Sequence, residues 1–131
     1  MSQDIRELID MHWRLANERR WNEFAELLAA NLHYQVPQTR EYIEGGEGYL
    51  DMFRTWPGDW KVIVRHLVCE SNVAMSIISF EVGSEQMTGI SHFQVRAGRI
   101  EAVTDYWPEP YEPPVRNSPW LKRQACGVRA A

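Results

Sequence analysis

Apolar residues in the first part of the chain recur every three to four positions, which is the spacing of amphipathic helices. The pattern predicts one helix over residues 4–17 and a second over residues 21–30, joined so closely that they pack as a hairpin. A third helix is predicted over residues 47–55, between a polar loop at 39–46 and the helix-ending Pro57.

Further along, the apolar pattern changes to a period of two, which is typical of strands. A short strand over residues 32–36 stops before a proline, which cannot donate to a strand ladder. From residue 60 onward the alternation predicts strands over 60–70 and 73–82, followed by a hairpin over 86–107 that turns at Ala97–Gly98.

The order of these elements predicts an α+β domain. Three helices followed by four long antiparallel strands require a strongly curved sheet if the helices are to close over it. The apolar phase of the strand 73–82 changes between Ile77 and Ile78, which predicts a bulge or bend there. We expect the domain to cover residues 1–107 and residues 108–131 to form a proline-rich surface tail, with Trp120 docked.

Composition and charge narrow the class of protein. The 131 residues suit one domain with one core, and the net charge of −4 offers no broad attraction for nucleic acid. No apolar run reaches the roughly 20 residues that span a bilayer, and the acidic, amphipathic start is unlike a secretory signal. Two cysteines are too few for a disulfide scaffold, and Cys69 fits a core position. We therefore expect a reduced, cytoplasmic protein without a nucleic-acid or membrane partner.

The chain has four histidines, which are His12, His33, His66 and His92. They lack the HxxxH or HExxH spacing that places two metal ligands on one helix face, so neither a metal nor another cofactor is expected. His12 falls on the apolar stripe of the first predicted helix. There it is either a satisfied core histidine or an imidazole that faces a ligand.

The order of the elements, together with three local stretches, resembles a known family. The stretches are AELLAANLHYQVP, VRHLVCESN and SHFQVRAGRIEAVTDYW. Over residues 4–107 the chain resembles the nuclear transport factor 2-like fold and, within it, the SnoaL-like family. The resemblance implies a cone, in which a curved, mostly antiparallel sheet wraps three N-terminal helices and leaves an apolar pocket on its concave side.

Members of this superfamily differ in function, so the resemblance implies a fold rather than one activity. They include ketosteroid isomerases, scytalone and bile acid dehydratases, polyketide cyclases and limonene epoxide hydrolases, and some have no known catalysis. The stretch LHYQVPQTREY is also similar to the small subunit of ring-hydroxylating dioxygenases, although this chain lacks the usual length of that subunit.

The last predicted strand has two alternating sets of side chains, and one of them must face the pocket. The more apolar set comprises Ile100, Ala102, Thr104 and Tyr106. The other set comprises Glu101, Val103, Asp105 and Trp107. Hydrophobicity alone turns the first set inward, whereas the resemblance implies that the second set lines the pocket, and we follow the resemblance. The first set and His92 would then need cover from outside, which favours a homodimer through the convex face.

Asp105 is the candidate catalytic base. Desolvation in an apolar pocket raises the pKa of a carboxyl group, and such a group can act as a general base near neutral pH. His66 stands among apolar neighbours, and VRHLV resembles the strand that carries a catalytic histidine in the dehydratases. The resemblance implies that His66 orients Asp105 or protonates the product. Alternatively, Asp105 is a solvated or salt-bridged acid, and His66 bonds to structural groups.

The remaining expected ligand contacts are mostly aromatic, which suits a flat or cyclic apolar ligand and equally suits a closed core. They are His12, Tyr34, Phe53, Trp56, Met75, Ser91, Phe93, Val103 and Trp107. The resemblance implies that Val36 stands in place of the base of ketosteroid isomerases, Ser91 in place of their oxyanion acid, and His12 near their oxyanion tyrosine. Steroid isomerisation by that mechanism is therefore not expected.

Two hypotheses from different classes follow. The first is a cofactor-independent lyase, isomerase or cyclase that acts on a cyclic or polyketide-like apolar substrate. Asp105 would be its base, and Tyr34 and His12 would hydrogen-bond the substrate oxygen. The second is a non-catalytic ligand-binding or accessory dimeric domain that uses the same cavity.

Overall fold

The chain mixes helices with short strands up to residue 55 and then forms four consecutive strands over residues 60–106. The computed structural model describes residues 2–125. In chain order the elements are α1 (Ser2–Asn17), α2 (Trp21–Ala25), β1 (Leu28–Val36), β2 (Glu41–Glu44), α3 (Gly46–Thr55), β3 (Trp60–Glu70), β4 (Val73–Val82), β5 (Glu85–Arg96) and β6 (Arg99–Tyr106).

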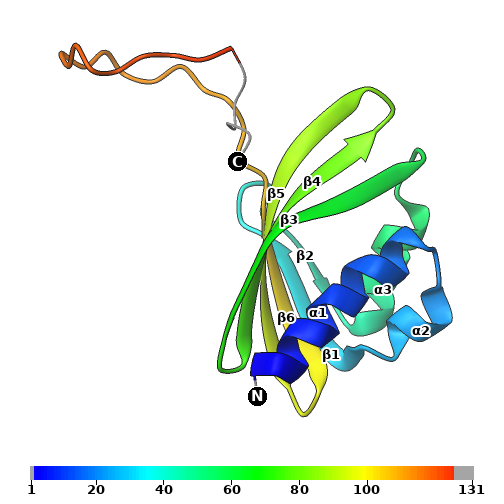
Figure 1. Cartoon of the computed structure of the whole chain (residues 1–131). Helices are drawn as coiled ribbons and strands as arrows, with labels where there is room; N and C mark the ends of the chain where they lie inside the picture. The colour runs from blue at the N-terminus through cyan, green and yellow to red at the C-terminus, as the bar shows by residue number, and fades with distance from the viewer. Residues whose placement is uncertain (1, 126–131) are drawn as a thin grey trace.

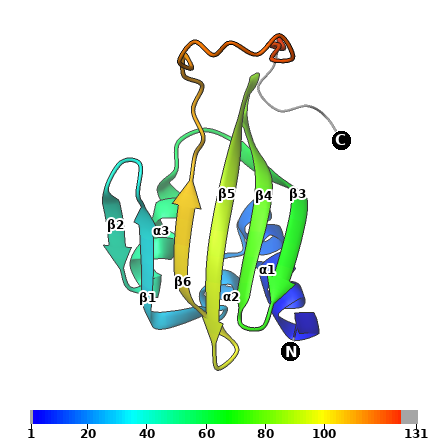
Figure 2. The same cartoon turned by 90° about the vertical axis from the view of Figure 1, so that its left-hand side faces the viewer.

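The strands form one curved sheet in the order β2-β1-β6-β5-β4-β3, and the helices lie against its concave side (Figures 1 and 2). Neighbouring strands are antiparallel except for β1 and β6, which are parallel. Apolar side chains from the helices and from the inner face of the sheet share one buried core. The α+β fold expected from the sequence is confirmed.

β1 begins earlier than the sequence predicts, because pairing with a distant strand overrides the helical spacing. α2 ends at Ala25, whereas the apolar spacing predicts a helix to residue 30. Leu28 instead pairs with Ile100 of β6, and the amide of Ile100 donates to the carbonyl oxygen of Leu27 at 2.8 Å. The predicted strand 32–36 is the second half of a strand of 9 residues.

The edge strand β2 lies where the sequence predicts a loop. It pairs antiparallel with the second half of β1, from His33–Glu44 to Val36–Glu41. Its sequence is EYIE, in which Ile43 is the partly buried position. A short, polar edge strand lacks the apolar alternation by which the other strands are found.

The bulge that the sequence predicts in β4 lies in the neighbouring strand β3. Val64 and His66 pair with two consecutive residues of β4, so Arg65 is an extra residue in β3. β4 itself is regular, and its buried inward side chains are Ala74, Ser76, Ile78 and Phe80. Because this inward set contains small and polar residues, the apolar spacing does not reveal it.

The β5–β6 hairpin turns at Ala97–Gly98 as predicted, with positive φ angles of 52° and 75°. A register shift follows, because Gln94 pairs with Ala102 and Val95 with Ile100. The shift turns Ile100 into the core, where it is fully buried. The prediction that Ile100 faces a partner subunit is therefore wrong.

The tail leaves the end of β6 and runs away from the sheet (Figures 1 and 2). Its polar contacts include an ion pair between Arg123 and Glu112 at 2.6 Å, which lies within the tail. Trp120 is 87% exposed, so the prediction that it docks on the domain is wrong for this chain. Cys69 is partly buried against the core, and Cys126 lies outside the described residues. None of the described helices is long and apolar enough to cross a membrane.

Candidate functional site

Asp105 lies near the end of β6, on the concave face of the sheet. Alternation along β6 buries Val103 and Asp105, which are 0% and 5% exposed, and leaves Tyr106 outside. Ser91 of β5 pairs directly with Asp105, and Tyr34 of β1 pairs with Val103. The two neighbouring strands thus bring one hydroxyl group to each side of the carboxyl group.

Both carboxylate oxygens of Asp105 accept a hydrogen bond from a neutral hydroxyl. The Tyr34 hydroxyl donates to Oδ2 at 2.7 Å, and the Ser91 hydroxyl donates to Oδ1 at 2.6 Å. All three side chains are buried. Within residues 2–125, no basic side chain forms an ion pair with this carboxylate. Asp105 is therefore neither the solvated nor the salt-bridged acid that the sequence left open.

Burial controls the ionisation of this cluster. Removal from water raises the pKa of Asp105 above its ordinary value of 3.8, and the hydroxyls of Ser91 and Tyr34 oppose that rise. The pKa of Tyr34 is also raised, first by burial and then by the negative charge of Asp105. Tyr34 therefore keeps its proton and acts as a neutral donor.

A small apolar cavity adjoins Asp105. Its volume is about 20 Å³, which is enough for roughly one water molecule. The side chains that line it are Trp13, Tyr34, Met52, Phe53, Trp56, Ile78, Phe80, Asp105 and Trp107. Asp105 is the acidic residue that lines this cavity, and Tyr34 is the lining residue that carries a hydroxyl group.

A second polar cluster lies among the aromatic side chains of the core. His12 is fully buried, and its Nε2 lies 2.7 Å from the hydroxyl oxygen of Tyr49. Its Nδ1 has no hydrogen-bond partner among the described residues. Burial lowers the pKa of His12 to about 3, so the imidazole is neutral at physiological pH. The Tyr49 ring lies 5.3 Å from the Tyr34 ring and thereby connects this cluster to the one around Asp105.

A family model for the SnoaL-like domain matches residues 6–103. The chain belongs to the SnoaL-like domain family. The matched segment runs from α1 into β6 and so contains every strand of the sheet in whole or in part. A search of curated proteins finds no significant match.

Solved structures share the fold of this SnoaL-like domain. A protein from Kribbella flavida DSM 17836, described provisionally as a ketosteroid isomerase, is 34% identical, covers 95% of this chain and 93% of its own, and has a TM-score of 0.89. An LEH-like epoxide hydrolase from M. tuberculosis is 15% identical, with 82% and 84% of the two chains covered and a TM-score of 0.71. A Xanthomonas campestris protein, described provisionally as a polyketide cyclase, is 17% identical, with coverage of 82% and 92% and a TM-score of 0.65. The last two show the fold alone.

The structure does not bring His66 to Asp105. The extra residue Arg65 reverses the alternation of β3, so His66 is exposed and pairs with Ile77, on the convex side. The predicted pairing of His66 with Asp105 is therefore wrong. Met75 is 37% exposed on the same side, so its predicted place in the pocket is wrong as well.

The other predicted contacts divide into two groups. Those that line the cavity are Tyr34, Phe53, Trp56 and Trp107. Those that are buried without lining it are His12, Ser91, Phe93 and Val103. Within the second group, Ser91 reaches the site through its hydrogen bond to Asp105.

Sequence reasoning missed four lining residues, which are Trp13, Met52, Ile78 and Phe80. Ile78 and Phe80 belong to the inward set of β4, and the bulge wrongly predicted in β4 hid that set. Trp13 follows His12 in α1, and its indole N–H donates to the Ser76 hydroxyl at 3.2 Å. Among the described residues, no three His, Cys, Asp or Glu side chains are placed to hold a metal ion.

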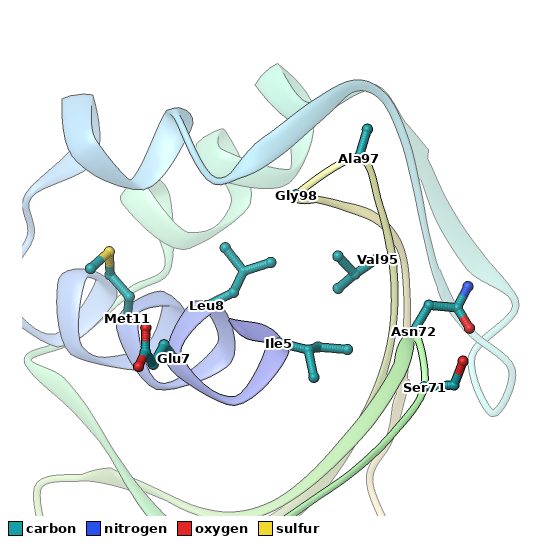
Figure 3. Close-up of a pocket in the computed structure, with 9 residues that line it drawn as sticks. All are labelled: Ile5, Glu7, Leu8, Met11, Ser71, Asn72, Val95, Ala97 and Gly98. Atoms are coloured by element: carbon teal, nitrogen blue, oxygen red, sulfur yellow. The ribbon is translucent and has the colours of Figure 1, made fainter. Parts of the chain in front are cut away.

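A larger and more open groove lies at the other end of the domain, between α1 and the turns of the two strand hairpins. It encloses about 550 Å³, and Ile5, Leu8 and Val95 point into it (Figure 3). The rest of its lining is Glu7, Met11, Ser71, Asn72, Ala97 and Gly98. Although it is larger, it contains neither Asp105 nor Tyr34, so we place the candidate chemistry at the smaller cavity.

Proposed function

We propose that this SnoaL-like domain is a cofactor-independent lyase, isomerase or cyclase that binds a cyclic or polyketide-like apolar molecule at the Asp105 cavity. The observation that carries the proposal is a buried carboxyl group that borders an aromatic cavity and has neutral hydroxyl partners. Such a carboxylate is a stronger base than a solvated one, because burial raises the pKa of its conjugate acid.

Asp105 acts as the general base. Its carboxylate takes a proton from a carbon next to a carbonyl group, and the bonding electrons move to the carbonyl oxygen to give an enolate. Return of the proton to another carbon completes an isomerisation, and loss of a leaving group from the next carbon completes an elimination. Ser91 holds Oδ1 of Asp105 in place through both steps.

Tyr34 supports the charge that develops on the substrate. Its hydroxyl donates to Asp105 Oδ2 while that group is charged. Once Asp105 has gained the proton, it no longer needs a charge-stabilising donor, and the Tyr34 hydroxyl can turn to the enolate oxygen. Because Tyr34 lines the cavity and its pKa is raised by burial, it arrives there as a neutral donor.

Exchange of hydrogen for deuterium in 2-tetralone tests the proposal. This bicyclic ketone has acidic protons next to its carbonyl, and NMR in D₂O follows their loss. We expect Asp105→Asn to slow the protein-catalysed exchange by about 100-fold, the usual scale of a general base. Asp51→Asn, at an exposed acid on α3, is the matched control and should exchange as the wild type does. Equal rates for wild type and Asp105→Asn would refute the base.

The second candidate is a non-catalytic ligand-binding or accessory domain. The observation that favours it is the small size of the cavity, about 20 Å³, since ligand pockets commonly enclose roughly 300–1,000 Å³. Under this alternative, the exchange rate of 2-tetralone equals that of the uncatalysed solution, whether or not the ketone binds and shields Trp56 and Trp107.

We also propose that the domain forms a homodimer through the convex face of the sheet and works in the cytoplasm. The convex face exposes apolar side chains, including Val68 at 62% and Met75 at 37%. Met75→Asp should convert a dimer to a monomer in light scattering, and Val115→Asp, in the exposed tail, should not. A wild-type monomer at all concentrations would refute the dimer.

A further inference from the structure

We infer that Trp107 is the wall that limits the size of the ligand in the Asp105 cavity, and that Gln38 and Gly89 hold it there. The inference rests on the proposed function for the location of the ligand. It adds a specificity-determining residue, Trp107, and two positioning residues that touch neither Asp105 nor the cavity. The ligand class that it implies is a bicyclic molecule such as 2-tetralone in the wild type and a larger, three-ring molecule once Trp107 is displaced.

Several walls of the cavity are fixed. Tyr34 is held by Asp105 at 2.7 Å, and Trp13 is held by Ser76 at 3.2 Å. Phe80 is buried and stacks on Trp60 with ring centroids 5.7 Å apart. These walls cannot move without breaking a buried hydrogen bond or the packing of the core.

The walls toward solvent are partly exposed and can move more easily. Met52 and Trp107 are partly buried, and Trp56 is 39% exposed. With a cavity of about 20 Å³, any ligand larger than a water molecule needs one of these three side chains to move. Rotation of a partly exposed side chain costs far less than repacking of the core.

Gly89 identifies Trp107 as the decisive wall. A Cβ at residue 89 would lie 2.8 Å from the six-membered ring of Trp107, so the indole occupies the place of the missing side chain. The same indole meets the Phe80 ring edge-to-face, with centroids 5.8 Å apart and planes at 89°. Because Gly89 has no side chain, the indole of Trp107 can approach the backbone of β5 closely while it lines the cavity.

Gln38 fixes the backbone beneath this side chain. Its amide group donates to the Trp107 carbonyl at 2.8 Å and accepts from the Trp107 N–H at 2.5 Å. The side-chain amide of Gln38 thus bonds to the backbone of Trp107 as a residue of a neighbouring antiparallel strand would, one residue beyond the end of β6. Trp107 can thus rotate its indole while its backbone stays in register with the sheet.

Binding of the fluorescent probe N-phenyl-1-naphthylamine tests the inference. Both Trp107→Ala, which removes the indole, and Gly89→Ala, which pushes the intact indole aside, should bind the probe about tenfold more tightly than the wild type, since one more buried ring is worth at least that factor. Gly89 does not have a positive φ, so alanine fits its backbone. The inference is overturned if both variants bind the probe as the wild type does.

Matched controls locate the effect. Trp120→Ala, in the exposed tail, and Met11→Asp, in the open groove, should leave the dissociation constant of the probe unchanged. A tightening by Trp56→Ala but not by Trp107→Ala would transfer the limiting role to Trp56 and overturn the inference.

Gln38 has its own control on the same strand pair. Gln35 donates to the Thr104 hydroxyl at 3.2 Å and thus also joins β1 to β6, whereas the hydrogen bonds described for Trp107 come from Gln38. Gln38→Ala should speed hydrogen exchange at the Trp107 amide by about tenfold and tighten probe binding, whereas Gln35→Ala should do neither. Equal behaviour of the two variants would overturn the positioning role.

The two proposals fail separately. Probe binding is repeated in an Asp105→Asn background, which removes the base but leaves Trp107 in place. If Asp105→Asn loses 2-tetralone exchange but Trp107→Ala does not change the dissociation constant of the probe, the limiting role of Trp107 is refuted and the base is not. If Trp107→Ala binds the probe more tightly but the wild type does not accelerate 2-tetralone exchange, the base is refuted and the limiting role of Trp107 is not.

Discussion

Replacement of Tyr34 by phenylalanine should make Asp105 harder to ionise. The change removes the hydroxyl that donates to Asp105 Oδ2 at 2.7 Å and keeps the ring that packs against Tyr49. The hydrogen bond stabilises the charged form of Asp105, so its loss raises a pKa that burial has already raised. The pH at which proton abstraction reaches half of its maximum should therefore move upward.

The size of the effect follows from the nature of the bond. A hydrogen bond to a charged group contributes about 1.5–3 kcal/mol, and one between neutral groups about 0.5–1.5 kcal/mol. The difference between the ionised and protonated states of Asp105 is thus about 1–1.5 kcal/mol, which corresponds to roughly one pKa unit. Ser91→Ala, which removes the bond to Oδ1 at 2.6 Å, should give a shift of the same sign and similar size.

The assay is the pH profile of 2-tetralone exchange, with urea unfolding of the same variants at low and neutral pH. Because the folded pKa of Asp105 is raised, its contribution to stability is present at low pH and is lost as the pH rises through that pKa. Tyr34→Phe should therefore cost more stability at pH 7 than at pH 4. If the midpoint of the pH profile of exchange is unchanged or lower in Tyr34→Phe, or if the loss of unfolding free energy is the same at both pH values, the hydroxyl of Tyr34 does not stabilise a charged Asp105.

Two further predictions concern parts of the chain outside the cluster. Because burial lowers the pKa of His12 to about 3, the contribution of the neutral imidazole to stability is lost as the pH falls below the ordinary value of 6.5. Between pH 7 and pH 4, the free energy of unfolding in urea should therefore fall less for His12→Gln than for the wild type, by up to roughly 3 kcal/mol. A chain that ends at Pro108 should unfold in urea within about 0.5 kcal/mol of the full chain, since the tail is exposed; a larger loss would contradict the predicted domain boundary at residue 107.

The long strands could be predicted from the sequence, because their alternation repeats over many residues, whereas the cone was implied by the family resemblance. Residues 60–70 and 73–82 are strands in the structure with the predicted bounds. The start of β1 could not be predicted, because its first residue is held by Ile100, far away in the chain, and the local spacing remains helical. The four-residue β2 has no apolar pattern to predict.

The site was predictable only in part, for a reason that lies in strand geometry. Alternation places every second side chain on one face, so one extra residue reverses all later positions. Arg65 is such a residue, and it turns His66 away from the face that the spacing predicts. Nothing in local hydrophobicity marks it. The partners of Asp105, which are Tyr34 and Ser91, come from strands far apart in the sequence and are joined only by pairing in the sheet.

A buried base at Asp105 should hold its proton more tightly than an ordinary carboxyl group, and titration of its carboxyl carbon measures this. Carbon-13 NMR of protein labelled at the aspartate carboxyl carbon follows each group with pH, and the signal missing from Asp105→Asn identifies Asp105. We predict a pKa above the ordinary value of 3.8. A pKa at or below that value would show a solvated or charge-paired acid and would rule out a buried base at Asp105.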